Sequence, residues 1–208
     1  HSTDSREYDG TSWTAGNSMN NPKALHCGCG TQTAALASHG TPHPNSTSEE
    51  YNGTSWTAGG TIGTARYNVG GGGSSSSAVA FGGYYSSSYR DNSEDYNGTS
   101  WSAGNSLNGA RGVYNGGDGA SADYVYAVSG DGAASGGGSN TNKVELYNGT
   151  SWSTLASIAT GRRSGAAGTQ SGSSSAIYFG GRTTADQNLT EEFTGETSAL
   201  GFSTITTS

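Results

Sequence analysis

A short motif recurs along the chain at nearly constant intervals, and it constrains the fold more than any other feature. It reads Tyr-Asn-Gly-Thr-Ser-Trp, with Asp for Asn in the first copy. Its aromatic residues are Tyr8 and Trp13, Tyr51 and Trp56, Tyr96 and Trp101, and Tyr147 and Trp152, so that successive Trp residues are 43, 45 and 51 positions apart. Self-similarity at a period of about 40–50 residues is typical of repeat architectures. We therefore expect one structural unit per motif.

A second pattern lies between successive motifs. It begins with a basic residue (Lys23, Arg66, Arg111 and Arg163) and ends in a short apolar stretch closed by small residues, at 34–40, 78–83, 124–130 and 176–181. A degraded motif at 192–198 follows the last stretch, with Phe193 in the Tyr place. The two patterns predict four short strands per unit. No segment shows helical periodicity, so the sequence predicts an all-β protein.

The Asn-Gly or Asp-Gly pair of each motif lies between the third and fourth predicted strands. This dipeptide is the strongest short signal for a β-hairpin, because a type I′ turn requires positive φ at both central residues. We therefore expect a two-residue type I′ turn in each copy, with the motif's Tyr and Trp on the two strands that it connects.

The order of these residues resembles the kelch family, whose repeats show a basic residue, an apolar strand ending in Gly-Gly, a Tyr and a Trp. Arg66, Gly82-Gly83, Tyr96 and Trp101 reproduce that order. The resemblance implies a β-propeller of four-stranded blades in which the motif's aromatic residues are scaffold. Two departures are a shorter Tyr-to-Trp gap and the replacement of Gly-Gly by His39-Gly40 and Ser129-Gly130. The motif is also similar to repeats in structural and tail-fibre proteins of marine bacterial viruses.

The repeat boundaries predict a single domain over residues 1–208. Its units are at about 23–57, 66–102, 111–153 and 163–200, with a half unit at 1–14. We expect a kelch-like β-propeller of about five blades, four of them complete, in which residues 202–207 complete the N-terminal half unit by strand exchange. The alternatives are further blades upstream of His1, as in a fragment of a larger ring, or an open solenoid.

The composition indicates a thin core built from aromatic rings. With 36 Gly, 30% hydrophobic and 12% charged residues, the chain has features of a disordered segment. However, 12 Tyr and 4 Trp are present, and each large ring can bury about 150–250 Å². The net charge is −7, and the nine Lys and Arg residues form no cluster, which argues against a nucleic-acid partner. No apolar run approaches the roughly 18 residues of a membrane helix, so we expect no membrane insertion.

One cluster contains residue types that bind metals. Cys27 and Cys29 flank a single Gly, and His39 and His43 follow nearby. Paired zinc ligands usually have a longer spacing. In a strand the two Cys side chains point to the same face, which equally suits small buried residues of an inner strand. Buried structural residues, a metal site and a disulfide all remain open.

Two other patterns have both a structural and a functional interpretation. Asn residues at 45, 52, 97, 148 and 188 match the N-glycosylation pattern, but the predicted hairpin turn already explains the Asn-Gly-Thr copies. The segment 116–119, with Asp123 and Asp131, resembles Gly/Asp calcium loops without matching the spacing of an EF-hand or a nonapeptide repeat. Calcium binding is therefore an alternative to ordinary acidic turns.

No catalytic motif is evident, such as a nucleophile elbow before a helix or a zincin His-Glu pair, so we expect a non-enzymatic protein without a cofactor. We expect a structural or binding module on a virion or extracellular surface, which recognises a cell-surface glycan or receptor through loops on a rigid scaffold. The alternative is an assembly subunit of a fibre, tail or filament that contacts other virion or fibre subunits. Both interpretations allow a homo-oligomer. Candidate ligand-binding residues, in loops where the units differ, are Tyr84, Tyr85, Tyr89, Arg90, Asp118 and Asp131.

Overall fold

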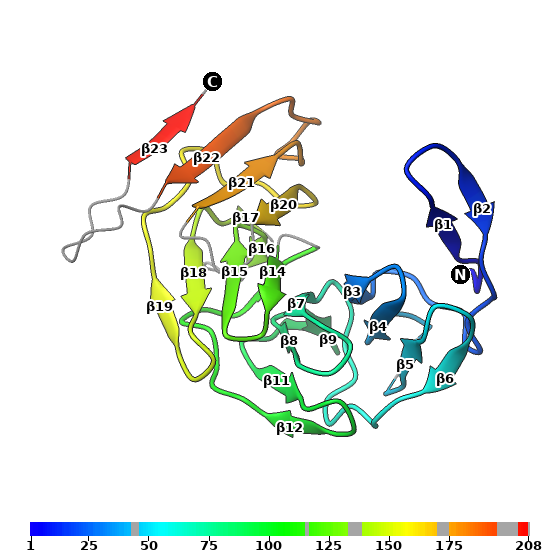
Figure 1. Ribbon diagram of the computed structural model, residues 1–208. Helices are drawn as coiled ribbons and strands as arrows, with labels where there is room; N and C mark the ends of the chain where they lie inside the picture. Colours follow the sequence, from blue (N-terminus) through cyan, green and yellow to red (C-terminus); the bar gives the residue numbers. More distant parts are fainter. Residues whose placement is uncertain (43–45, 115–116, 133–138, 170–174, 195–203, 208) are drawn as a thin grey trace.

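The computed structural model describes residues 1–42, 46–114, 117–132, 139–169, 175–194 and 204–207 (Figure 1). These residues form strands and turns, and no helix occurs among them. The predicted all-β class is therefore confirmed.

Four antiparallel sheets of four strands each form most of the structure. Unit 1 contains β3 (Cys27–Thr31), β4 (Ala34–Ser38), β5 (Ser48–Tyr51) and β6 (Trp56–Ala58). Unit 2 contains β7 (Gly70–Gly73), β8 (Ala78–Phe81), β11 (Ser93–Tyr96) and β12 (Trp101–Ala103). Unit 3 contains β14 (Gly117–Ser121), β15 (Tyr124–Val128), β18 (Val144–Tyr147) and β19 (Trp152–Thr154). Unit 4 contains β20 (Ala166–Thr169), β21 (Ser175–Phe179), β22 (Thr190–Thr194) and β23 (Thr204–Thr207).

Three smaller sheets complete the fold. The N-terminal hairpin pairs β1 (Arg6–Tyr8) with β2 (Trp13–Ala15). Short excursions between the second and third strands of units 2 and 3 form the other two. In unit 2 these are β9 (Tyr84–Tyr85) and β10 (Ser88–Tyr89). In unit 3 they are β16 (Asp131–Gly132) and β17 (Ser139–Asn140), and β16 pairs with both β17 and β13 (Arg111–Gly112).

The sheets follow one another in chain order along an arc, from the N-terminal hairpin to unit 4 (Figure 1). The first strands of neighbouring units are in contact, β3 with β7, β7 with β14, and β14 with β20. The third and fourth strands lie toward the outside of the arc (Figure 1). The four glycines of β7 are all buried. Because they carry no side chains, the neighbouring strands can approach the backbone of β7 closely. A Cβ on Gly71, for example, would lie 2.2 Å from Cys27 Sγ.

The predicted completion of the N-terminal half unit by residues 202–207 is wrong. Within that range, β23 pairs with β22, in the register Glu191↔Thr207 to Thr194↔Thr204. It therefore supplies the fourth strand of unit 4, which the sequence pattern had placed before residue 200. The N-terminal hairpin remains two-stranded, and Figure 1 shows a gap between it and unit 4.

The repeated motif forms the same hairpin in every copy, but not through the predicted type I′ turn. Tyr and Trp are directly opposite across the third and fourth strands, as in Tyr51↔Trp56. Gly53 alone of the turn residues has positive φ, at 87°. The Asn52 side chain instead accepts hydrogen bonds from the backbone N–H groups of Thr54 and Ser55, at 3.0 and 2.9 Å. The structural role of Asn in this turn is that of a side-chain acceptor, as in an Asx turn.

In units 2, 3 and 4 a buried ion pair connects the basic residue that precedes the first strand with a glutamate of the third strand. The pairs are Arg66–Glu94, Arg111–Glu145 and Arg162–Glu191. In unit 1 the corresponding Lys23 is buried and its Nζ donates to the Thr47 carbonyl oxygen at 3.0 Å. The prediction that Arg163 occupies this position in unit 4 is wrong by one residue. Arg162 is the buried residue, and its guanidinium lies 4.7 Å from the centre of the Tyr178 ring.

The Gly-Gly position explains why His39 and Ser129 are tolerated. The first residue of the pair has a φ of 58–64° in all four units, which His and Ser can adopt. The second residue is always Gly with a φ of 93–118°. A Cβ there would clash with backbone atoms of the segment that precedes the first strand. On Gly130, for example, it would lie 2.3 Å from the Gly112 carbonyl oxygen. The second glycine is thus the indispensable one.

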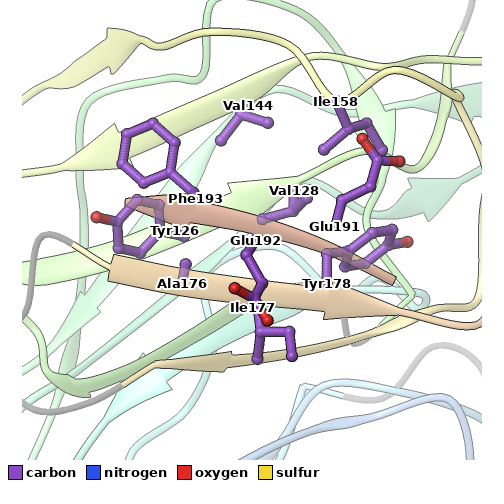
Figure 2. A pocket seen from close by; sticks show the side chains of 10 residues that line it. All are labelled: Tyr126, Val128, Val144, Ile158, Ala176, Ile177, Tyr178, Glu191, Glu192 and Phe193. Atoms are coloured by element: carbon purple, nitrogen blue, oxygen red, sulfur yellow. The ribbon is translucent and has the colours of Figure 1, made fainter. Parts of the chain in front are cut away.

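Hydrophobic contacts between successive units form the core. Val79 and Phe81 of unit 2 pack on Tyr147 and Trp152 of unit 3, and the rings of Phe81 and Trp152 are 4.6 Å apart. Figure 2 shows the equivalent contact between units 3 and 4, where Tyr126 faces Phe193. Because each unit buries little by itself, stability depends on its neighbours, as in other repeat proteins.

Candidate ligand-binding site

Four residues with left-handed backbone conformation line one pocket. They are Leu25 of unit 1, Asn68 of unit 2, Tyr114 of unit 3 and Ser164 of unit 4, with φ values of 49–58°. Each follows the basic residue at the start of its unit. Backbone hydrogen bonds connect the first three, since Asn68 N–H donates to the Leu25 carbonyl oxygen at 3.1 Å and Tyr114 N–H donates to that of Asn68 at 3.3 Å. The pocket has a volume of about 290 Å³, and Gly165 and Ala166 complete its lining.

In each unit, the segment between the second and third strands begins beside this pocket. In every unit, the residue after the basic residue pairs with the residue after the second glycine. The pairs are Ala24↔Thr41, Tyr67↔Tyr84, Gly112↔Asp131 and Arg163↔Arg182. The scaffold therefore presents four equivalent positions with four different side chains. This variation is typical of a binding surface, where loops carry specificity and the framework stays constant.

Unit 2 contributes an aromatic group. Its excursion is a hairpin whose turn residues Ser86 and Ser87 both have positive φ, which gives the backbone signature of a type I′ turn. Tyr84 and Tyr89 face each other across the hairpin, with ring centres 5.0 Å apart, and Tyr67 lies 5.6 Å from Tyr84. These three rings form a partly exposed aromatic cluster.

Unit 3 adds a carboxylate beside the aromatic group. Asp131 is 5% exposed and pairs with Arg163 of unit 4 at 3.3 Å. The pKa of Tyr89 is raised well above its usual range, because burial and then the neighbouring Asp131 carboxylate disfavour the phenolate. The pKa of Tyr114 is also raised, by burial and then by the charge of Asp131. Both phenols are therefore neutral hydrogen-bonding groups at physiological pH.

Two buried acceptor atoms at this site have no hydrogen-bond partner among the described residues. They are Oδ1 of Asp131 and Oδ1 of Asn68, on side chains that are 5% and 7% exposed. Native proteins rarely leave such atoms unsatisfied. Gly112 lies between the two regions, since a Cβ there would be 3.0 Å from the Tyr114 ring and 3.5 Å from the Tyr89 ring and from Asn68 Cβ. Aromatic faces and unsatisfied acceptors thus occur together.

The structure brings together half of the predicted ligand-binding residues. Tyr84, Tyr89 and Asp131 belong to the site. Tyr85 and Arg90 instead contact each other, with the guanidinium 5.6 Å from the ring centre. Asp118 lies in β14, and its side chain is outside the described part of the structure.

Sequence reasoning missed Tyr67, Asn68, Tyr114 and Arg163 as site residues. The residue after the basic residue also differs from unit to unit (Ala24, Tyr67, Gly112 and Arg163). Applying the criterion of unit-to-unit variation to this position would have identified Tyr67, but not Arg163, because the sequence pattern assigned Arg163 as the basic residue itself. Asn is enriched in the left-handed conformation that Asn68 adopts, whereas the positive φ of Tyr114 has no equivalent sequence signal.

The described members of the Cys/His cluster do not assemble a metal site. Cys27 is buried against β7, and Cys29 Sγ lies 3.8 Å from the Ser74 carbonyl oxygen; both are free thiols. Burial raises the pKa of Cys27 to about 12. His39 Nε2 is 3.2 Å from Glu94 Oε2 and its Nδ1 is 3.0 Å from Ser38 Oγ. His43 lies outside the described residues, within which no three His, Cys, Asp or Glu residues converge.

The motif's aromatic residues are engaged in the scaffold. In each copy the Tyr and Trp rings lie 4.9–5.2 Å apart at 31–34°.

Within the described ranges there is also no helix long and apolar enough to cross a membrane.

Comparison with known proteins adds no relative. The sequence matches no protein-family model and no curated protein.

Proposed function

We propose that this chain is a non-enzymatic, kelch-like β-propeller module that binds a glycan at the site between units 2, 3 and 4. The observation that carries the proposal is the combination of the Tyr67, Tyr84 and Tyr89 rings with the unsatisfied Oδ1 atoms of Asp131 and Asn68. Aromatic faces pack against the C–H faces of sugars, and carboxylate and amide oxygens accept hydrogen bonds from their hydroxyls. Ligand sites generally combine such apolar walls with a few convergent polar groups.

The arrangement of the units supports the propeller. Four-stranded antiparallel sheets follow one another with their first strands in contact, and all four excursions occur at equivalent positions. In this proposal the 208 residues supply four blades and the outer two strands of another, and the domain is displayed on a virion or extracellular surface. Class averages from negative-stain electron microscopy test the ring. Stacked units in a straight line would contradict it.

A glycan array probed with the labelled full-length chain tests the binding function. We expect enrichment of a set of related glycans and a loss of at least about tenfold in signal for Tyr84→Ala, because hydrophobic and stacking contacts of one ring contribute on this scale. Tyr85→Ala is the matched control, since alternate residues of a strand point to opposite faces and Tyr85 contacts Arg90 instead. No enriched glycan, or equal loss in both variants, would contradict the proposal.

A further inference from the structure

Each unit presents two different faces to its neighbours. The forward face, toward the following unit, carries the central apolar residue of the second strand and the residue before the motif's Tyr. In units 2 and 4 these are Val79 with Asp95 and Ile177 with Glu192, which are paired across the strands. The backward face carries the motif's Tyr and Trp. In Figure 2, Ile177 and Glu192 point away from unit 3, whereas Tyr178 and Phe193 point toward it.

Hydrogen bonds match these faces along the chain. The motif's Tyr hydroxyl donates to the carboxylate that precedes the Tyr of the previous unit. Tyr51 donates to Glu7, Tyr96 donates to Glu50, and Tyr147 donates to both oxygens of Asp95 at 3.1 and 3.2 Å. The pKa of Tyr96 is raised to about 12 by burial and by Glu50, and that of Tyr147 is raised to about 12 by burial and by Asp95.

The one exception follows the same rule. Unit 4 has Phe193 in the Tyr place, so it has no hydroxyl to donate. The preceding unit has Leu146 where the others have a carboxylate, and both residues belong to one hydrophobic cluster. The polar and apolar versions of this position are therefore matched: a carboxylate accepts a hydrogen bond from a tyrosine, whereas Leu146 and Phe193 pack against the same apolar cluster.

Among the described residues, the N-terminal hairpin and unit 4 each have an exposed face. On the N-terminal hairpin, Tyr8 and Trp13 are 46% and 69% exposed, and the Tyr8 hydroxyl donates to the nearby Gly10 carbonyl oxygen. On the forward face of unit 4, Phe179 is 45% exposed, whereas the equivalent Phe81 is fully buried. Glu192 is exposed beside it, and a shallow depression lined by Ile177 and Glu192 lies on this face.

These two faces are complementary by the rule of the internal contacts. The carboxylate of Glu192 predicts a tyrosine as its partner, and in the described part of the chain the Tyr8 hydroxyl donates to a backbone carbonyl and not to a carboxylate. The strands that carry them, β1 and β22, lie at opposite ends of the arc, across the gap in Figure 1. We propose that copies of this chain associate head to tail, with Tyr8 and Trp13 of one copy on Ile177, Phe179 and Glu192 of the next. Such a heterologous contact leaves one free face at each end, so that association continues until a ring closes or a filament forms.

Complementary blocked variants test the polarity of the contact. Trp13→Ala removes the large ring of the backward face, and Ile177→Asp places a charge in the forward face. In sedimentation velocity we expect the unmodified chain to form species that grow with concentration, and each variant alone to remain monomeric. An equimolar mixture has one intact face of each kind, so it forms a one-to-one dimer and nothing larger. A monomeric unmodified chain at every concentration, or variants that associate normally, would overturn the proposal.

A compensating pair of substitutions tests the specific contact and does not depend on disrupting a face. Tyr8→Phe alone and Glu192→Leu alone each leave one polar group unmatched, and we expect each to weaken association about tenfold. The double variant reproduces the Leu146–Phe193 pair and regains affinity to within about threefold of the unmodified chain. Circular dichroism confirms that each variant is folded. Losses in the double variant that equal the sum of the single losses would show that these residues do not meet.

Discussion

The first and fourth copies of the motif have the same local geometry in opposite environments. Tyr8–Trp13 and Tyr147–Trp152 have ring separations of 5.2 and 5.0 Å and interplanar angles of 34° and 31°. The first pair is 46% and 69% exposed, whereas the second is 2% and 7% exposed. The turn therefore determines how the two rings meet, and the neighbouring unit determines whether they are buried. Local structure and stability have different sources in this fold.

Substitutions at the position two residues before the motif's Tyr should give the largest difference in the free energy of unfolding between the fourth and the first copy of the motif. Glu145 forms a buried ion pair with Arg111, whereas Arg6 occupies the same place in the N-terminal hairpin and is exposed. Glu145→Ala leaves a buried charge without its partner and should lower the free energy of unfolding by about 3–5 kcal/mol. Arg6→Ala should change it by less than about 0.5 kcal/mol. Urea denaturation measures both, and equal effects would contradict the comparison.

The Trp residues themselves should show nearly as large a difference. Trp152→Ala removes a ring that packs on Phe81 and should cost about 3–5 kcal/mol. For Trp13→Ala, at concentrations where the chain is monomeric, we expect less than about 1 kcal/mol because the ring is mainly exposed. Chemical denaturation at low protein concentration gives the two values. A large loss for Trp13→Ala would show that the hairpin is buried within one copy.

Acid should weaken the contact between units 1 and 2 in particular. His39 is fully buried against Glu94, Arg66, Ser38 and Trp101, and desolvation lowers its pKa to about 4. Above its unfolded pKa of 6.5, His39 is neutral in both states. As the pH falls from 6.5 to 4, the unfolded chain takes up a proton that the folded chain does not bind. Stability should fall by about 3 kcal/mol over this window.

The control for this pH dependence is His39→Gly, which installs the residue found at the equivalent Gly82 and Gly180 positions. Stability measured by thermal unfolding across the same pH window should become flatter in the variant. The pKa of Glu94 is also lowered from 4.5, because its interactions with His39 and Arg66 outweigh desolvation, so acid sensitivity below about pH 4.5 should persist. An unchanged pH profile in His39→Gly would exclude His39 as the titrating group.

Substitutions of the turn's side-chain acceptor should have the smallest effects on stability, and these should be equal in the first and fourth copies of the motif. Asn148 and Asp9 each accept two backbone N–H hydrogen bonds within their own turn. Asn148→Ala and Asp9→Ala should each weaken the local turn by about 1 kcal/mol. Hydrogen exchange of the amides of Ser151 and Ser12 measures this locally. Unequal changes would mean that neighbouring units also shape the turn.

The sequence was informative where the determinants are local or repeated, and less so elsewhere. Period, apolar stretches and hairpin positions predicted the all-β class and the strands of units 1 to 3. The pattern could not distinguish Arg162 from Arg163, because two adjacent arginines fit the same place and only the alternation of side chains decides which is buried. It also misassigned the partner of 204–207, since strand pairing depends on which edge is free after the other strands have formed.

The candidate site was partly predictable for the same reason. Tyr84, Tyr89 and Asp131 stand in loops that differ between units, so sequence comparison of the units found them. Asn68 and Tyr114 reach the pocket through left-handed backbone conformations, which are common for Asn but unusual for Tyr. Their convergence with residues of two other units is a property of how the units are arranged in space.

Oxidative footprinting of the four Trp residues by hydroxyl radicals tests most directly whether the neighbouring unit buries the motif. In dilute monomeric protein, the account predicts the fastest modification at Trp13, intermediate rates at Trp56 and Trp101, and the slowest at Trp152, following their exposure. Equal rates at Trp13 and Trp152 would contradict it.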